Sequence, residues 1–148
     1  MLKERVLQIT KEMVGIYSPT NTAEEQKVEA YLLQLLQEMP YFKEHPEHCG
    51  AFDCVDDCFN RSTIYGLVLG KSKKTVVFMG HHDVVSTEVY GALADFATDT
   101  EALEEKLKGV DLPKEASADL ASGEWLWGRG TCDMKGGTAT QLAVLEEY

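Results

Sequence analysis

The sequence predicts an α/β fold in which helices flank a sheet. Apolar residues recur at helical spacing in the first part of the chain, and two runs between residues 62 and 79 are rich in β-branched residues. A glycine-rich turn near residue 130 then leads into another helix. With 148 residues, of which 44% are apolar and 26% charged, the chain is long enough for one domain with its own core.

Two helices are expected in the first quarter of the chain. In segment 2–16, valine, isoleucine and methionine residues recur every three or four positions with charged residues between them. Thr22 and Glu25 have the spacing of a capping box at the start of a second helix. The apolar stripe of this helix runs to about Met39, and Pro40 is expected to stop it.

Segment 41–60 gathers residue types that ligate metals. These are His45, His48, Cys49, Cys54 and Cys58. The spacing of the cysteines does not form the paired short Cys knuckles of structural zinc sites. We therefore expect a loop that leads into an edge strand, with a Cys/His zinc-binding module as the alternative.

Two neighbouring strands are predicted after this segment. Segment 62–69 is strand-like, 70–74 is a lysine-rich turn, and 75–79 is a second apolar strand. Because Gly80 follows at once, the second strand is expected to end at the edge of the sheet, where open α/β sheets place ligand sites.

A long acidic excursion, 86–123, separates the two segments that carry the candidate site. One helix is expected over 100–108, and Pro113 should break it. So long a connection is unusual unless it packs as a subdomain or covers the site. After a short tryptophan-containing approach, 128–130 forms a turn and a helix opens at Gly136.

Charge and composition exclude some classes of partner. The net charge of −11 argues against a nucleic-acid partner, since phosphate binding needs clustered lysine and arginine. No run approaches the roughly 18 apolar residues of a membrane span, and the first residues lack an apolar signal-peptide core. We expect a cytoplasmic protein without a membrane partner, whose four cysteines are reduced thiols.

Two short segments carry the candidate chemistry. His81 and Asp83 follow the predicted strand, and a carboxylate two residues after a histidine can fix the orientation of its ring. Asp133 lies in a turn bracketed by glycines, which permit close approach to a ligand. A single histidine after a strand is more often packed or solvated than a ligand. A phosphate-binding loop is the rival interpretation of the turn, but its spacing fits no phosphate-loop motif.

Together these segments resemble a known family. Gly-His-His-Asp-Val-Val (80–85) and Gly-Arg-Gly-Thr-Cys-Asp-Met-Lys-Gly-Gly (128–137) are similar to the two N-terminal signatures of the co-catalytic zinc peptidases. That family includes acetylornithine deacetylase, succinyl-diaminopimelate desuccinylase, aminoacylase and carboxypeptidases. The Ser-Gly-Glu-Trp approach (122–125) and the acidic excursion resemble its arginine-utilisation RocB subgroup.

The resemblance implies a fold and a site. The fold would be the N-terminal portion of a three-layer α/β/α catalytic domain, in which a mixed sheet is flanked by helices. His81 would ligate one metal, Asp133 would bridge two metals, and Asp83 would assist catalysis as the partner of His81. The two metals would be Zn²⁺, with Co²⁺ or Mn²⁺ as substitutes. The family often has a cis peptide after the bridging aspartate, here Asp133–Met134, and neither His82 nor Cys132 receives a ligand role.

The family's chemistry also needs groups that this sequence does not supply. They are a Glu-Glu pair that provides the general base and a ligand, a further acidic ligand, a distant histidine, and a lid or dimerisation domain. Glu146 and Glu147 form such a pair, but they come too early, and a solvated helix end is the better interpretation. Residues 1–148 are thus expected to form a partial catalytic domain, inactive alone and prone to poor solubility or homo-oligomerisation.

For the parent protein, the resemblance implies an amidohydrolase or peptidase. A water bridging two Zn²⁺ ions would cleave an amide bond of a small N-acyl amino acid or short peptide, with arginine catabolism as the setting. The alternative is a truncated or degenerate non-catalytic fragment that binds a partner or has no role. Metal content separates the two, because a working site holds about two Zn²⁺ ions per chain.

Overall fold

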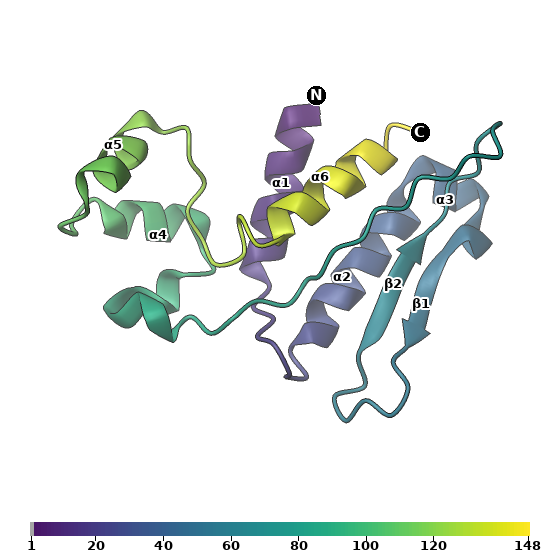
Figure 1. Ribbon diagram of the computed structural model, residues 1–148, viewed down its shortest axis with the longest axis horizontal. Coiled ribbons are helices and arrows are strands. Elements are labelled where there is room, and N and C mark those ends of the chain that lie inside the picture. Colours follow the sequence, from purple (N-terminus) through teal and green to yellow (C-terminus); the bar gives the residue numbers. More distant parts are fainter. Residues whose placement is uncertain (1) are drawn as a thin grey trace.

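The computed structural model describes residues 2–148 and confirms a mixed α/β fold in which helices flank a small sheet (Figure 1). The elements in chain order are α1 (Leu2–Gly15), α2 (Glu25–Glu38), α3 (Pro40–Glu44), the 3₁₀ helix η1 (Pro46–His48), β1 (Cys49–Asp53), β2 (Ser62–Gly66), the 3₁₀ helix η2 (Glu88–Phe96), α4 (Thr100–Leu107), α5 (Lys114–Ser122) and α6 (Lys135–Leu145). None of the described helices is long and apolar enough to cross a membrane.

The core lies where α1 packs against α2 and α6. Its buried residues come from these three helices, from α3, from the junction of α2 and α3, and from the start of β1: Ile9, Met13, Val28, Leu32, Leu35, Leu36, Met39, Phe42, Cys49, Ala139, Leu142 and Ala143. The apolar stripe predicted for the first helix supplies the buried Ile9 and Met13. Burial of a large apolar side chain stabilises a fold by roughly 1.5–3 kcal/mol, so this cluster is what holds α1 and α6 side by side.

Helix α2 begins close to its predicted start, with a different cap. The side chain of Glu25 accepts a hydrogen bond from the backbone N–H of Asn21 at 2.8 Å, rather than from Thr22 as the capping box predicts. The Thr22 hydroxyl donates to the carbonyl of Pro19 instead. The helix ends at Glu38 as expected, and Pro40 opens α3 because a proline fits the first turn of a helix.

The only sheet of the described residues has two antiparallel strands, β1 and β2, in a register that pairs Cys49 with Gly66 and Asp53 with Ser62. The predicted loop of 41–60 therefore contains both α3 and the partner strand of β2. Segment 75–79, predicted as the neighbouring strand, is not a strand. Apolar, β-branched composition indicated an extended backbone correctly, but it does not specify which segment provides the hydrogen-bonding partner.

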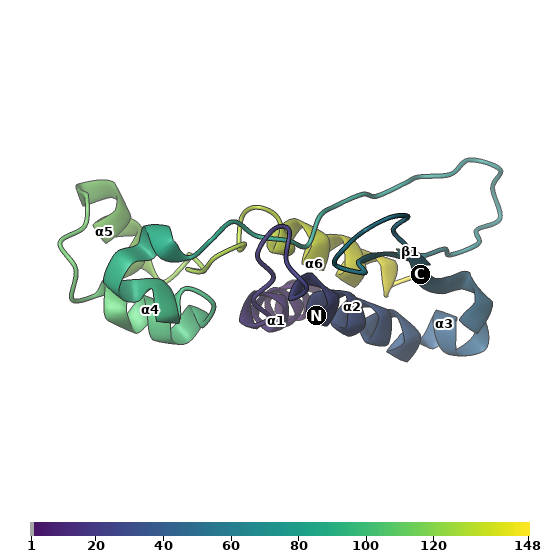
Figure 2. The ribbon, with the colours of Figure 1, turned by 90° about the horizontal axis from the view of Figure 1, so that it is seen from below.

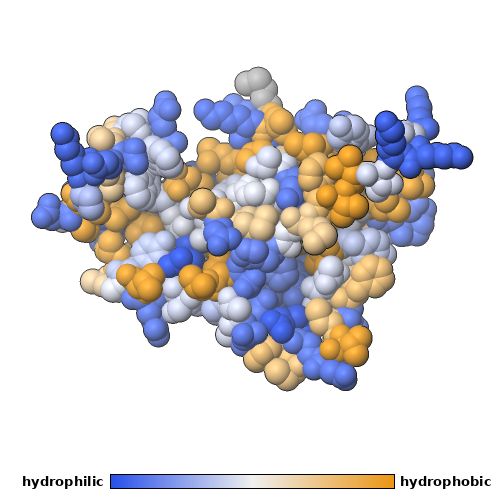
Figure 3. Space-filling model, in the orientation of Figure 1, coloured by the Kyte–Doolittle hydropathy of each residue, from blue (hydrophilic) through white to orange (hydrophobic). Residues whose placement is uncertain are grey.

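After β2 the chain bends at residues 71–73 and turns back, and the returning segment leads to the candidate site in an arch away from the helices (Figure 2). Its apolar side chains are exposed, at 76% for Val76, 72% for Val77, 58% for Phe78 and 81% for Met79. Further apolar patches are visible among the polar groups on the face shown in Figure 3. Unpaired, apolar, extended backbone is a template for association with another strand.

The acidic excursion forms a lobe at one end of the molecule, with η2, α4 and α5 (Figure 1). The predicted helix over 100–108 is confirmed as α4, and the Asp99 carboxylate caps it by accepting from the N–H groups of Glu101 and Ala102. Helix α5 was not predicted, and it follows Pro113 directly. Alanine and serine residues without a clear apolar stripe gave no helical period there, and none of its residues is buried.

Arg61 ties the loop between β1 and β2 to the start of α2. Its guanidinium donates to both carboxylate oxygens of Asp57 and to the buried carboxylate of Glu25 at 3.1 Å. The side chain of Asp57 is 9% exposed. Hydrogen bonds from Arg61 hold the pKa of Asp57 at about 2, below its ordinary value of 3.8.

We expect Asp57 to make stability dependent on acid. A carboxylate whose pKa is lower in the folded state contributes stability above its unfolded pKa, and the contribution disappears as pH falls from about 4 to about 2. Asp57→Asn should therefore lower the free energy of unfolding at pH 6, and the difference from wild type should shrink toward pH 2. Urea denaturation across this range measures it. A difference that is constant with pH would contradict the role of this ion pair.

The exposed segment 75–79 predicts self-association of the 148-residue chain. Val77→Lys combined with Met79→Lys should shift the chain toward a monomer in light scattering coupled to size exclusion, because charge blocks strand pairing. Val89→Lys, at an equally exposed valine of η2, is the matched control and should change little. A wild-type chain that is already a monodisperse monomer and melts cooperatively would contradict this expectation.

Candidate metal-binding site at the start of helix α6

His81 and Asp133 meet although they are 52 residues apart in the sequence. The Nε2 atom of His81 lies 2.9 Å from a carboxylate oxygen of Asp133. His81 follows the extended segment, and Asp133 lies in the turn that ends at the start of α6. The side chains are 48% and 85% exposed, respectively, so both remain open to a ligand.

Asp83 lies on the opposite side of the His81 ring. The Nδ1 atom of His81 is 3.2 Å from the backbone oxygen of Asp83 and 3.1 Å from its carboxylate. The imidazole is therefore held between two carboxylates, one at each nitrogen. This geometry suits a ligand histidine whose second nitrogen is fixed by a carboxylate, with Asp83 behind the ring.

The carboxylates set the protonation of this site. Partial burial lowers the pKa of His81, but the hydrogen bonds to Asp133 and Asp83 outweigh it, and the net shift is upward. Burial raises the pKa of Asp83, whereas the hydrogen bond from Thr20 and the charge of His81 lower it, and the net shift is downward. The Thr20 hydroxyl donates to Asp83 at 2.6 Å. An ionised Asp83 is thus available to orient His81.

The chain immediately after α1 positions the His81 segment. The Ser18 hydroxyl donates to the carbonyl of His82 at 2.7 Å, and the Val84 N–H donates to the Ser18 carbonyl at 2.8 Å. The Thr20 N–H then donates to the carbonyl of Val84 at 2.9 Å, which completes a short parallel bridge. The sequence pattern of 18–21 predicts only a helix breaker, because nothing in it indicates a partner 64 residues away.

Lys135 positions the other half of the site. Its side chain is fully buried, and its amino group donates to the carbonyls of Met13 at 2.9 Å and Ile16 at 2.6 Å. Burial lowers the pKa of Lys135 to about 8, although the charge of Asp83 acts in the opposite direction. Lys135 thereby gives the Met13 carbonyl, in the last turn of α1, a second donor, and it supplies a donor for the Ile16 carbonyl just beyond the helix. The sequence motif contains this lysine, but a pattern alone does not show that it is buried.

Gly130 allows the two halves to touch. Its φ is +88°, and a Cβ atom there would lie 2.7 Å from Cγ1 of Val84 and 3.2 Å from the Lys135 side chain. Only glycine adopts this backbone conformation readily. The turn before Asp133 is consequently packed against the segment that carries His81 and Asp83.

The remaining residues of the two motifs have separate places. The Asp133–Met134 peptide bond is cis, as the resemblance implied. Cys132 is exposed, and His82 is largely buried with its Nε2 atom 3.9 Å from the carboxylate of Glu29. Burial lowers the pKa of His82, although the charge of Glu29 opposes this. His82 thus points at α2, and its Nδ1 has no hydrogen-bond partner among the described residues.

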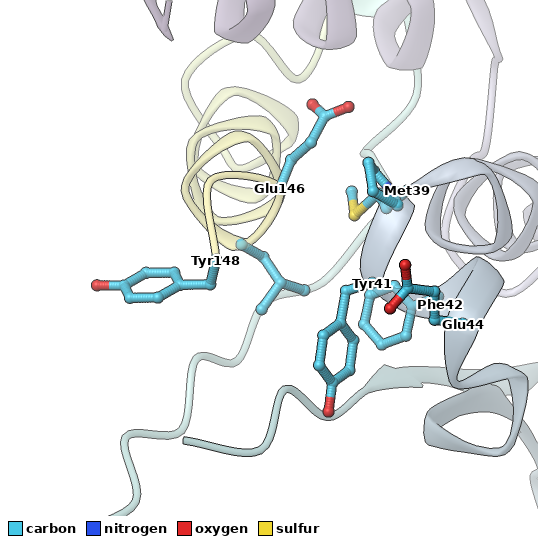
Figure 4. Close-up of a pocket in the computed structure, with 8 residues that line it drawn as sticks. Met39, Tyr41, Phe42, Glu44, Glu146 and Tyr148 are labelled. Carbon is cyan, nitrogen blue, oxygen red and sulfur yellow. The ribbon is translucent and has the colours of Figure 1, made fainter. Parts of the chain in front are cut away.

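The glutamate pair at the end of α6 does not reach this site. Glu146 forms a bidentate ion pair with Arg5 of α1, at 2.6 and 3.1 Å. It borders a pocket between α3 and the end of α6, where Met39, Phe42 and Tyr148 also lie (Figure 4). The pocket contains neither His81 nor Asp133. Helix α6 therefore separates this glutamate from the start of the helix.

The donor set fits part of a zinc site. An imidazole nitrogen and a carboxylate oxygen that face each other are ligand types that Zn²⁺ accepts, and the ring is oriented from behind. A catalytic zinc ion normally has three protein ligands, and His81 and Asp133 are two. In residues 2–148, no third acidic, histidine or cysteine side chain converges with them. Two such side chains could supply part of the ligand set of a metal centre.

Comparisons with known proteins agree with the subgroup indicated by the motifs. The chain is 33% identical over 147 residues to Protein RocB of Bacillus subtilis (strain 168), and 37% identical over 147 residues to the uncharacterized protein YqjN of the same organism. These alignments cover 98% and 97% of this chain but 26% of each relative. The chain thus spans about a quarter of the length of these curated relatives. No protein-family model and no solved structure matches it.

The turn before α6 predicts opposite effects at two adjacent glycines. A Cβ atom at Gly136 would lie 2.3 Å from the backbone oxygen of Thr131, whereas at Gly137 the nearest atom is the flexible end of Met134 at 3.4 Å. Gly136→Ala should lower the free energy of unfolding by more than about 1 kcal/mol, because the clash exceeds the gain in helix propensity. Gly137→Ala should be neutral or stabilising. Equal effects in urea denaturation would contradict this packing.

Proposed function

We propose that the parent protein is a metal-dependent amidohydrolase and that this chain supplies one side of its metal centre. The observation that carries the proposal is the Asp83–His81–Asp133 arrangement, in which one imidazole faces a carboxylate at each nitrogen. Similarity to RocB over nearly the whole chain supports the same subgroup. Substrates would be small N-acyl amino acids or short peptides, in the setting of arginine catabolism.

His81 and Asp133 are the residues that would hold the metals. Bound Zn²⁺ ions, or Co²⁺ or Mn²⁺ in their place, would polarise the scissile carbonyl and acidify water. For this the Nε2 atom of His81 must be free of a proton, which requires the proton of a neutral ring to lie on Nδ1. Asp83 accepts at Nδ1 and thus favours the required tautomer. Asp83 is therefore a positioning residue that acts through His81.

The remaining ligands and the general base would come from outside these 148 residues. This expectation has two grounds. His81 and Asp133 are only two ligands, and each relative is about four times as long as the region that matches this chain. The isolated chain should accordingly show no amidase activity. If instead it hydrolyses N-acyl amino acids in a zinc-dependent way, and loses this on His81→Ala, the division of the site is wrong.

The function is tested with the full-length protein. Its purified zinc form should hydrolyse members of a panel of N-acyl amino acids and dipeptides, followed by release of the free amine. His81→Ala and Asp133→Ala should each lower kcat/KM by at least about 100-fold, and Asp83→Asn by about 10–100-fold through weaker metal binding. Cys132→Ser is the matched control, since this exposed thiol adjoins Asp133 without a role in the proposal.

The outcomes of these experiments separate the amidohydrolase hypothesis from that of a degenerate, non-catalytic fragment. Activity that survives Asp133→Ala, or that falls equally in Cys132→Ser, would contradict this assignment of ligands. A full-length protein that binds no metal and cleaves no member of the panel would instead favour the degenerate, non-catalytic alternative. Metal analysis and thermal melting accompany the kinetics. A variant that has lost only a ligand binds less metal but still melts cooperatively, whereas an unfolded variant also loses its cooperative melting transition.

A further inference from the structure

A second group of metal-ligating side chains lies where α3 passes into η1. His45, Glu47 and His48 each offer one ligand atom, and these atoms all lie within 4.8 Å of one another. A carboxylate oxygen of Glu47 is 3.9 Å from Nδ1 of His45 and 3.4 Å from Nε2 of His48. In residues 2–148 this is the only group of three or more such residues that converges in this way.

These separations are close to those of a metal site. Zinc–nitrogen and zinc–oxygen bonds of about 2.0–2.1 Å at tetrahedral angles place two ligand atoms roughly 3.3 Å apart. The distance between Glu47 and His48 already has this value, and that between Glu47 and His45 exceeds it by a few tenths of an ångström. Small rotations of exposed side chains, at 44% for His45 and 66% for Glu47, would close the difference.

Tyr41 orients His48 from the other side. Its hydroxyl lies 2.9 Å from Nδ1 of His48, and the same oxygen accepts a hydrogen bond from the N–H of Leu69 at 2.9 Å. The phenol oxygen can accept both N–H groups and direct its own proton to solvent. Nδ1 then carries the proton of a neutral ring and Nε2 is free to ligate, as in metal sites where a neighbouring oxygen fixes the histidine.

The three ligands are held in a short, stiff stretch of chain. Pro46 fixes the backbone between His45 and Glu47. The two imidazole rings stack on each other with centroids 5.2 Å apart, and Tyr41 packs against both. Little conformational freedom would therefore be lost on binding, and the exposed side leaves room for water to complete the coordination.

The donor atoms select a class of ion. Two imidazoles and one carboxylate suit Zn²⁺, Cu²⁺ or Ni²⁺ rather than Mg²⁺ or Ca²⁺, which take oxygen ligands. The neighbouring cysteines do not join the group. Cys49 is buried, and burial raises the pKa of its thiol, which disfavours the thiolate that metals bind. This site thus differs from the Cys/His module considered from the sequence.

We propose that His45, Glu47 and His48 bind one divalent transition-metal ion of the zinc class, independently of the centre at His81 and Asp133. The competing explanation is a surface ion pair between Glu47 and a protonated histidine, which binds no metal. The two explanations predict different metal content and different effects of the Tyr41→Phe substitution.

The test compares metal content in matched variants of the purified full-length protein. His45→Asn combined with Glu47→Gln changes two exposed side chains and leaves the core intact. After dialysis against buffered micromolar Zn²⁺, this double variant should hold one equivalent fewer than wild type while keeping the kinetics of wild type. His81→Ala should retain the equivalent that the double variant loses. Identical metal content in wild type and the double variant would overturn the proposal.

Tyr41→Phe provides a second measurement. It removes no ligand, but it should weaken Zn²⁺ binding at this site by about 10-fold or more in calorimetric titrations of the His81→Ala background. Tyr65→Phe is the matched control, because the Tyr65 ring stacks on Phe52 in the same sheet and its hydroxyl is not part of the group. If Tyr41→Phe and Tyr65→Phe bind Zn²⁺ with equal affinity, the metal is not held in the geometry proposed.

Discussion

The candidate centre depends on one constraint, which is how the end of α1 satisfies its backbone hydrogen bonds. Buried Lys135 donates to carbonyls at that end, and the chain just beyond exchanges hydrogen bonds with His82 and Val84. One short stretch thereby fixes both the turn that carries Asp133 and the segment that carries His81. Neither segment lies in a sheet, so the distance between them is set by this stretch rather than by strand pairing.

The electrostatics of the site follow from that anchoring. His81 is held between two carboxylates in a chain of net charge −11, and its pKa rises in consequence. A divalent cation that replaced the proton at Nε2 would meet the carboxylate of Asp133 already in place. The high exposure of both side chains agrees with a centre that further parts of a longer protein complete, as the length of RocB and YqjN allows.

Segment 75–79 and the lobe formed by residues 86–123 are also largely exposed. The segment has the composition of an interior strand but pairs with no strand within the described residues, and the lobe buries few of its own residues. Both features agree with our proposal that these residues are part of a larger catalytic domain. The His45–Glu47–His48 group, by contrast, is assembled from contiguous residues and needs no additional chain.

The sequence by itself determined the helices with a clear apolar stripe, the site segments and the residue types at the centre, because these depend on local spacing and on the glycines around Asp133. It did not determine that β2 pairs with β1, that 75–79 pairs with no strand of the described residues, or that Lys135 and Ser18 position the site. Those features are contacts between residues that are distant in the sequence. A local pattern indicates which polar groups need hydrogen-bond partners, but it does not indicate where in the chain those partners lie. Only the tertiary structure decided that His81 faces Asp83 at one nitrogen and Asp133 at the other.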